Sequence, residues 1–183
     1  MSGALAERGR AVFLVGFMGS GKSAVGEILA AQLGWEFADT DARVEQALGR
    51  PVETIFREAG EGRFREAEWR VLQELGGDVP RVVATGGGLY LGVVQRKFMR
   101  EQGMSVWLDV PLEEIRRRIG SGPGRPLWAA GDRVAQRAFF EKRRAAYALA
   151  DLRVPAGDRD PAQIAVLVRA RLDALPLIFP REK

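Results

Sequence analysis

Residues 11–33 read AVFLVGFMGSGKSAVGEILAAQL, and this stretch decides the fold class. Residues 11–15 form an apolar run typical of a buried parallel strand, and residues 24–33 have helical spacing. Between them, Gly16 to Ser23 match the phosphate-binding pattern G-x-x-x-x-G-K-[ST] at every fixed position. A glycine-rich turn that binds no ligand would not require Lys-Ser after its last glycine. The sequence therefore predicts a strand, a nucleotide-binding loop and a helix, in that order.

The residue types in this loop suit the phosphates of a nucleotide. Glycines let backbone N–H groups turn inward around phosphate oxygens, and the following helix adds its positive end. Lys22 can reach the outer phosphates, and the hydroxyl of Ser23 can ligate Mg2+. The predicted nucleotide-binding set here is Gly19, Ser20, Gly21, Lys22, Ser23 and Ala24.

Length and composition narrow the setting. A chain of 183 residues is long enough for one sizeable core, so we expect a single domain over residues 1–183. Cys and His are both absent, which excludes disulfides, thiol nucleophiles, Cys/His zinc sites and histidine acid–base relays. The first ten residues are charged rather than apolar, and no apolar run approaches membrane-spanning length. We therefore expect a cytoplasmic protein with no membrane partner.

The formal net charge of +4 raises the question of nucleic acid binding. The basic residues are nearly all Arg, they are scattered, and they form no lysine-rich tail or long basic block. Because Arg suits bidentate recognition of carboxylate and phosphate, small anionic substrates explain this composition equally well. We expect no nucleic acid partner.

Strands and helices alternate along the chain, which predicts an α/β fold with a parallel sheet covered by helices on both faces. Ligands of such sheets bind at the carboxyl ends of the strands. The predicted strands are residues 11–15, 35–38, 81–85, 105–108 and 152–154. The predicted helices are residues 24–33, a region ending at 75 with breaks near 49–51 and 60–62, and residues 93–102, 112–119, 132–150 and 161–175.

Two motifs follow predicted strands and should lie beside the phosphate loop. In Asp39-Thr40-Asp41, one carboxylate could hold Mg2+ and the other could accept a proton or hydrogen bond from a phosphate acceptor. The alternative is helix capping by Asp41, which would account for only one of the two carboxylates. Gly86-Gly87-Gly88 would let a ligand or another backbone approach closely, although a plain tight turn is the simpler interpretation of this motif alone.

Taken together, these motifs resemble the shikimate kinases over nearly the whole chain. This resemblance implies a three-layer P-loop kinase fold, with a five-stranded parallel sheet between helices. It also implies ATP-dependent phosphorylation of shikimate to 3-phosphoshikimate, a step of aromatic amino-acid biosynthesis, with Mg2+ as cofactor. The motifs that carry it are the phosphate loop, residues 37–41, residues 55–68 with Phe64-Arg65, Thr85 to Gly88, residues 106–111, Arg125-Pro126-Leu127, and Arg143 four residues before Tyr147.

The resemblance assigns roles to individual residues. It implies that Ser23 ligates Mg2+ directly and that Asp39 supports the ion through water. It implies that Asp41 binds the shikimate hydroxyls and acts as a base or as an aligning group. It also implies that Arg65 and Arg143 bind the shikimate carboxylate. The implied catalytic set is Lys22, Asp41 and Arg125, and the implied acceptor-binding set is Asp41, Arg65, Gly86, Gly87, Gly88 and Arg143.

A mobile lid is expected around residues 120–132, where several glycines would allow closure that excludes water. In the related kinases, an arginine at the position of Arg125 reaches the ATP phosphates. The resemblance further implies adenine contacts from Arg117 or Arg118 and from Arg159. The sequence departs from the family pattern after Leu127, where residues 128–132 replace the commoner continuation.

Two alternatives stay open at this point. A different small-molecule kinase of this fold, such as a gluconate kinase, would keep the phosphate loop but need no arginine pair for a carboxylate. A nucleotide-dependent nucleic-acid-binding module would explain the basic charge but not the catalytic residues. We expect a monomer that acts on ATP and a small-molecule acceptor.

Overall fold

A five-stranded parallel sheet forms the centre of the protein in a computed structural model that describes residues 11–119 and 132–175. The strand order is β2-β3-β1-β4-β5, with every pair parallel. This confirms the α/β class and the five strands expected from the sequence. The strands are β1 (Ala11–Val15), β2 (Glu36–Asp39), β3 (Arg81–Ala84), β4 (Gly103–Asp109) and β5 (Leu152–Pro155).

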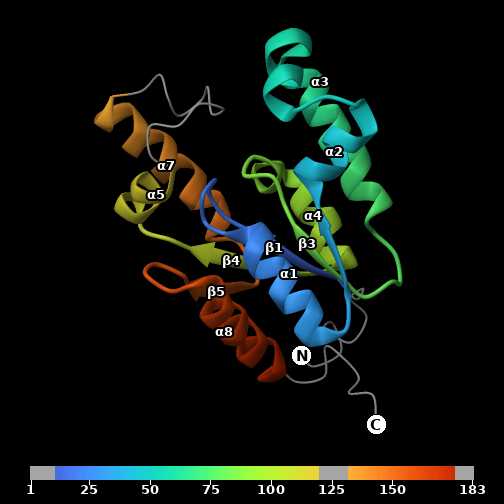
Figure 1. The fold of residues 1–183 in the computed structure, drawn as a ribbon, viewed down its shortest axis with the longest axis vertical. Coiled ribbons are helices and arrows are strands. Elements are labelled where there is room, and N and C mark those ends of the chain that lie inside the picture. The colour runs from blue at the N-terminus through green and yellow to red at the C-terminus, as the bar shows by residue number, and fades with distance from the viewer. Residues whose placement is uncertain (1–10, 120–131, 176–183) are drawn as a thin grey trace.

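Helices cover both faces of the sheet (Figure 1). Helices α1 and α8 lie side by side on one face, and α4 lies on the other. Helices α2 and α3 pack together beyond the carboxyl ends of the strands, across from α7. The helices are α1 (Lys22–Leu33), α2 (Thr40–Leu48), α3 (Val52–Glu74), the short 3-10 helix η1 (Leu89–Leu91), α4 (Val93–Gln102), α5 (Leu112–Ile119), α7 (Arg133–Tyr147) and α8 (Pro161–Asp173).

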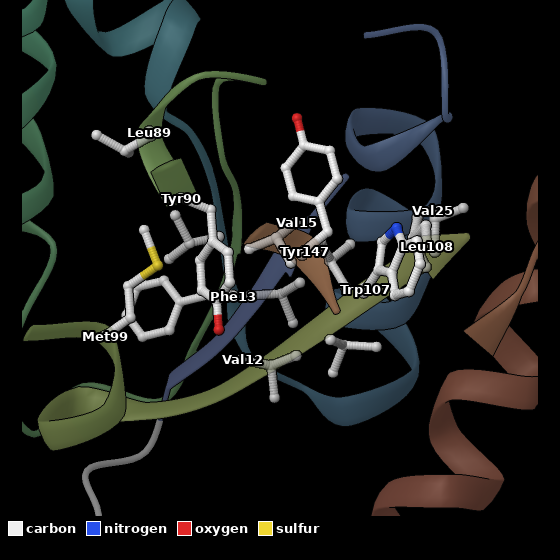
Figure 2. Close-up of a cluster of buried hydrophobic side chains, with 14 of the residues drawn as sticks. Val12, Phe13, Val15, Val25, Leu89, Tyr90, Met99, Trp107, Leu108 and Tyr147 are labelled. Carbon is white, nitrogen blue, oxygen red and sulfur yellow. The ribbon is translucent and has the colours of Figure 1, made fainter. Parts of the chain in front are cut away.

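The core explains why β1 is a continuous apolar run. All five of its residues are buried, because β1 has a hydrogen-bonded strand on each side and helices on both faces. Phe13 belongs to the same cluster as Tyr90 and Met99 (Figure 2). On the α1 side the packing is so close that a Cβ on Gly26 would lie 2.6 Å from the ring of Phe37. The central strand therefore fixes the position of the loop that follows it.

Several element boundaries differ from those predicted. Helix α1 begins at Lys22 rather than at residue 24, because the last glycine of the loop is its N-cap. Strand β4 is longer than predicted at both ends, and α7 ends at Tyr147 rather than at residue 150. The predicted break near residues 60–62 is confirmed as a kink inside α3, where Gly60 has φ 79° and ψ 167°. Such a conformation favours glycine.

The expected lid, residues 120–131 with Arg125, lies outside the described residues. None of the helices described in residues 11–119 and 132–175 combines the length and apolar composition that a membrane crossing needs.

Candidate active site

The phosphate loop joins β1 to α1 at the carboxyl edge of the sheet. Gly16, Gly19 and Gly21 have φ values of 144°, 75° and 89°, and such left-handed or unusual conformations favour glycine. They curl the backbone so that the loop ends at the first turn of α1. Lys22 lies across the loop and donates to the carbonyl oxygens of Gly16 and Phe17 at 3.0 and 2.9 Å. The predicted loop is therefore formed, and its lysine lines the cavity beside it.

In the Asp39-Thr40-Asp41 motif, Asp39 and Thr40 make different side-chain hydrogen bonds. Asp39 accepts hydrogen bonds from the backbone N–H groups of Asp41 and Ala42, so it is Asp39 that caps α2. The suggestion that Asp41 would be the cap is wrong, because Asp41 already lies inside the helix. The hydroxyl of Thr40 accepts from the N–H of Gly86 at 2.8 Å. The motif thereby joins α2 to the triple-glycine loop.

Asp39 also contacts the phosphate loop. Its Oδ2 accepts a hydrogen bond from Oγ of Ser23 at 2.5 Å, so the two predicted metal-site residues lie together. A hydroxyl and a carboxylate are oxygen donors of the kind that Mg2+ prefers. In residues 11–119 and 132–175, no group of three or more acidic side chains is arranged to hold a metal ion. The pair fits a magnesium ion whose other ligands come from phosphate and water.

The three glycines after β3 leave room for charged side chains from three helices. A Cβ on Gly86 would lie 2.5 Å from Oδ1 of Asp41 and would collide with Oε1 of Glu68. A Cβ on Gly88 would lie 2.5 Å from the guanidinium nitrogens of Arg65. At Gly87, a Cβ would come within 3.5 Å of Arg143. The motif is therefore more than a tight turn, since acceptor-site side chains occupy the space beside it.

A cavity of about 700 Å3 connects the phosphate loop to the glycine loop. It brings together most of the predicted phosphate, metal and acceptor residues. Ser20, which is buried, and Gly86, beside which two acidic groups lie, are not in its lining, and Arg125 lies outside the described residues. Apolar side chains of α3 form part of the wall. The lining residues are Met18, Gly19, Gly21, Lys22, Ser23, Ala24, Asp39, Asp41, Ala42, Glu45, Val52, Glu53, Phe56, Phe64, Arg65, Glu68, Thr85, Gly87, Gly88 and Arg143.

Arg65 faces this cavity from α3 while paired with two acids of its own helix. It contacts Oε2 of Glu68 at 2.5 Å and Oε1 of Glu61 at 3.0 Å. Burial opposes its charge, but Glu68 and Glu61 together raise the pKa of Arg65. Arg65 therefore forms the ion pairs expected of a surface arginine, and it also faces the cavity in which the acceptor site is predicted. Its guanidinium enters the site already oriented by two carboxylates.

Arg143 is in a different electrostatic situation. Its residue is only 6% exposed, and its guanidinium carbon lies 4.1 Å from the centroid of the Phe139 ring. Among the described residues, no carboxylate oxygen lies within 4.0 Å of its guanidinium nitrogens. Burial lowers the pKa of Arg143 below its usual value. A buried cation that lines a cavity without a carboxylate partner is suited to bind an anionic ligand.

Two buried carboxyl groups face the same point above Gly86. Oδ1 of Asp41 and Oε1 of Glu68 are buried, and neither has a hydrogen-bond partner within the described part of the chain. Burial raises the pKa of Asp41, and Asp39 adds to this while Lys22 and Arg65 oppose it. Burial raises the pKa of Glu68 to about 7, against the opposing effect of Arg65. The burial of these two atoms beside each other favours the neutral, protonated form of Glu68.

The arginines predicted to contact adenine lie outside the cavity lining. Arg118 is the nearest to the phosphate loop, since a Cβ on Gly21 would lie 3.9 Å from its Nη1. It donates to the carbonyl oxygen of Gly157 at 2.5 Å. Arg117 points to solvent and pairs with Glu114. Arg159 is exposed and donates to the Pro155 carbonyl. Of the two candidates on α5, Arg118 is the better placed.

Two residues that the sequence analysis quoted only as parts of motifs, Glu68 and Tyr147, contact predicted site residues in the structure. Glu68 is completely buried and pairs with Arg65, one helical turn away. Tyr147 donates from its hydroxyl to the carbonyl oxygen of Gly87 at 2.5 Å. The i,i+3 spacing from Arg65 and the i,i+4 spacing from Arg143 were the available signals, but such spacings are common on exposed helix faces.

A family model of shikimate kinase matches residues 18–173, which include the phosphate loop from Met18 onward, the triple-glycine loop, Arg65 and Arg143. The chain belongs to the shikimate kinase family. The family predicted from the sequence is thereby confirmed. Membership decides against the gluconate kinase and nucleic-acid-binding alternatives, and it implies ATP as the phosphoryl donor.

Relatives in this family match the chain over nearly its whole length. A shikimate kinase of Persephonella marina is 41% identical over 89% of this chain and 99% of its own. A shikimate kinase of Microcystis aeruginosa is 42% identical over 94% of this chain and 90% of its own. Among solved structures, shikimate kinase from Acinetobacter baumannii in complex with shikimate superposes with a TM-score of 0.84. It is 32% identical, and the match covers 93% of this chain and 97% of the other.

Proposed function

We propose that this protein transfers the terminal phosphoryl group of ATP to a hydroxyl group of shikimate. The observation that carries the proposal is Arg143, a buried cation without a carboxylate partner among the described residues, in the same cavity as Asp41. An acceptor that carries a carboxylate and hydroxyl groups can bind both residues, with its carboxylate on Arg143 and a hydroxyl on Asp41. Shikimate has this composition, and the related Acinetobacter baumannii enzyme has been solved in complex with it.

Binding and orientation of the acceptor fall to three side chains in this proposal. Arg143 and Arg65 hold the carboxylate, and the pairing of Arg65 with Glu68 fixes the direction of its remaining N–H groups. Asp41, which lines the same cavity, receives the hydrogen bond of the attacking hydroxyl. Fixing both ends of a rigid acceptor places the hydroxyl oxygen in line with the phosphoryl group.

The transfer itself needs charge neutralisation more than covalent help from the protein. The hydroxyl oxygen forms a bond to the terminal phosphorus of ATP, the bond from that phosphorus to its bridging oxygen breaks, and ADP leaves. The hydroxyl proton passes to Asp41, because burial raises the pKa of this carboxyl above its usual value and so makes it a better proton acceptor. Lys22 and the backbone N–H groups of the phosphate loop stabilise the phosphate charge.

A magnesium ion would be held by Ser23 directly and by Asp39 through water. When bound, it supplies positive charge that neutralises phosphate oxygens. The 2.5 Å contact between Ser23 and Asp39 supports this assignment, because it already places both oxygen donors beside the phosphate loop. The roles of Arg125, Arg118 and Arg159, the monomeric state and the cytoplasmic location stay predictions from the sequence.

An assay of ADP release tests the proposed function. Purified protein should consume ATP when Mg2+ and shikimate are both present, and not when either is omitted. Gluconate and nucleoside monophosphates, supplied in place of shikimate, should give background rates. Equal ATP consumption without shikimate would make the protein a simple ATPase, and faster turnover of gluconate would assign it a different acceptor.

A further inference from the structure

We propose that Tyr147 is a positioning residue of the acceptor site, acting through Gly87 and Arg143. The inference rests on the proposed function, because it concerns the residues that would hold the acceptor. Tyr147 is the last residue of α7 and is 2% exposed. It does not line the cavity, so its effect on a ligand must pass through the two groups that it contacts.

The hydroxyl of Tyr147 interacts with two groups of the site. It donates its single proton to the carbonyl oxygen of Gly87 at 2.5 Å. Its second neighbour is Arg143, one helical turn earlier, whose positive charge opposes the effect of burial on the pKa of Tyr147. A guanidinium has only donors, so the hydroxyl oxygen of Tyr147 is the atom that can accept from it. Burial raises the pKa of Tyr147 to about 12, so the proton needed for the bond to Gly87 stays in place at neutral pH.

These interactions bear on the direction of two groups of the site, the Arg143 guanidinium and the Gly87 carbonyl. The other neighbours of Arg143 are the rings of Phe139 and Phe17, and ring faces attract a cation without directing its individual N–H groups. The tyrosine oxygen supplies that direction. Because a peptide unit is planar, holding the Gly87 carbonyl also sets the direction of the Gly88 N–H. One hydroxyl therefore aligns the carboxylate-binding cation with the glycine loop beside it.

The chain supplies a matched control in its only other tyrosine. Tyr90 is also buried, at 3% exposure, and its hydroxyl is hydrogen-bonded to Ser105. Figure 2 shows the difference: the hydroxyl of Tyr90 points into the apolar cluster, whereas that of Tyr147 points out of it. Removal of either hydroxyl costs a buried hydrogen bond, but only Tyr147 contacts groups of the acceptor site.

The first experiment compares Tyr147→Phe with Tyr90→Phe. Calorimetry should show that Tyr147→Phe raises the dissociation constant for shikimate by about tenfold, a change of about 1.4 kcal/mol, and that for ATP by less than about twofold. The kcat at saturating shikimate should fall by a much smaller factor than the affinity for shikimate. Tyr90→Phe should leave both dissociation constants unchanged. Equal weakening of both ligands by Tyr147→Phe, or of neither, would overturn the inference.

A second measurement does not depend on the folding of Tyr147→Phe. In the Tyr90→Phe variant Tyr147 is the sole tyrosine, so 3-fluorotyrosine labelling gives a fluorine resonance from that residue alone. Saturating shikimate should shift this resonance, and an unchanged resonance would overturn the inference. Failure of the proposed function would look different, since wild-type protein would then neither bind nor phosphorylate shikimate.

Discussion

The replacement of Arg143 by methionine should separate stability from acceptor binding. Arg143 is buried, stacks on Phe139 and has no carboxylate within 4.0 Å among the described residues. The loss of its ring contacts and of its electrostatic interaction with Tyr147 costs about 1–3 kcal/mol in total. The removal of a buried unpaired charge returns a desolvation penalty of several kcal/mol. The apolar methionine chain also keeps part of the packing against the ring.

These effects nearly cancel in the folded protein, so we expect Arg143→Met to change the free energy of unfolding by no more than about 1 kcal/mol. Acceptor binding has no such compensation. A shikimate carboxylate left buried opposite methionine should lose about 2–5 kcal/mol, which is roughly thirtyfold to several thousandfold in affinity. ATP affinity should change little, because the contact of Arg143 with the phosphate loop is with the ring of Phe17 and not with the phosphate-binding N–H groups or Lys22.

Urea unfolding and calorimetric titration of shikimate and ATP measure the three quantities separately. Arg144→Met is the matched control, since Arg144 is the next residue but pairs with Asp109 and lies outside the cavity lining. It should leave shikimate binding unchanged. The reasoning would be refuted if Arg143→Met lost more than about 2 kcal/mol of stability while shikimate affinity stayed at its wild-type value.

Three further predictions follow from the charges in the cavity. Lys22→Met should lower kcat by at least about a hundredfold, roughly 2.7 kcal/mol, in a protein with unchanged circular dichroism; near-normal kcat would remove this loop from catalysis. Arg65→Lys should weaken shikimate about tenfold or more in separate titrations without weakening ATP, because a single ammonium cannot bridge Glu61 and Glu68 as the guanidinium does; equal effects on both ligands would contradict its place in the acceptor site. Because burial raises the pKa of Glu68 from 4.5 to about 7, folding takes up a proton between these values, and the free energy of unfolding should fall as pH rises through this window. Urea titrations at pH 5 and pH 8 should show a smaller decrease in Glu68→Gln, and an unchanged decrease would assign the effect to another group.

The phosphate loop and the sheet could be predicted because their signals are local. The loop is defined by a fixed spacing of residue types, and the buried central strand is a continuous apolar run. The identity of the α2 cap could not be predicted. Asp39 and Asp41 are equally good capping residues by type, and the choice depends on where the backbone leaves the strand.

The acceptor site depends on contacts between residues far apart in the chain. The reason for three glycines becomes visible only when α2, α3 and α7 bring Asp41, Arg65 and Arg143 beside them. Glu68 illustrates the same limit. A glutamate three residues after an arginine on a helix is usually an exposed pair, and its complete burial follows from how α3 packs against the glycine loop.

A comparison of shikimate with its methyl ester tests the central claim most directly, namely that a carboxylate of the acceptor binds the arginines beside the glycine loop. The ester keeps the ring and its hydroxyl groups but has no charge for Arg143 and Arg65 to bind. We predict that kcat/KM for the ester is at least about a hundredfold below that for shikimate in the wild-type protein, and that Arg143→Met narrows this difference. Equal turnover of acid and ester by the wild-type protein would contradict the account.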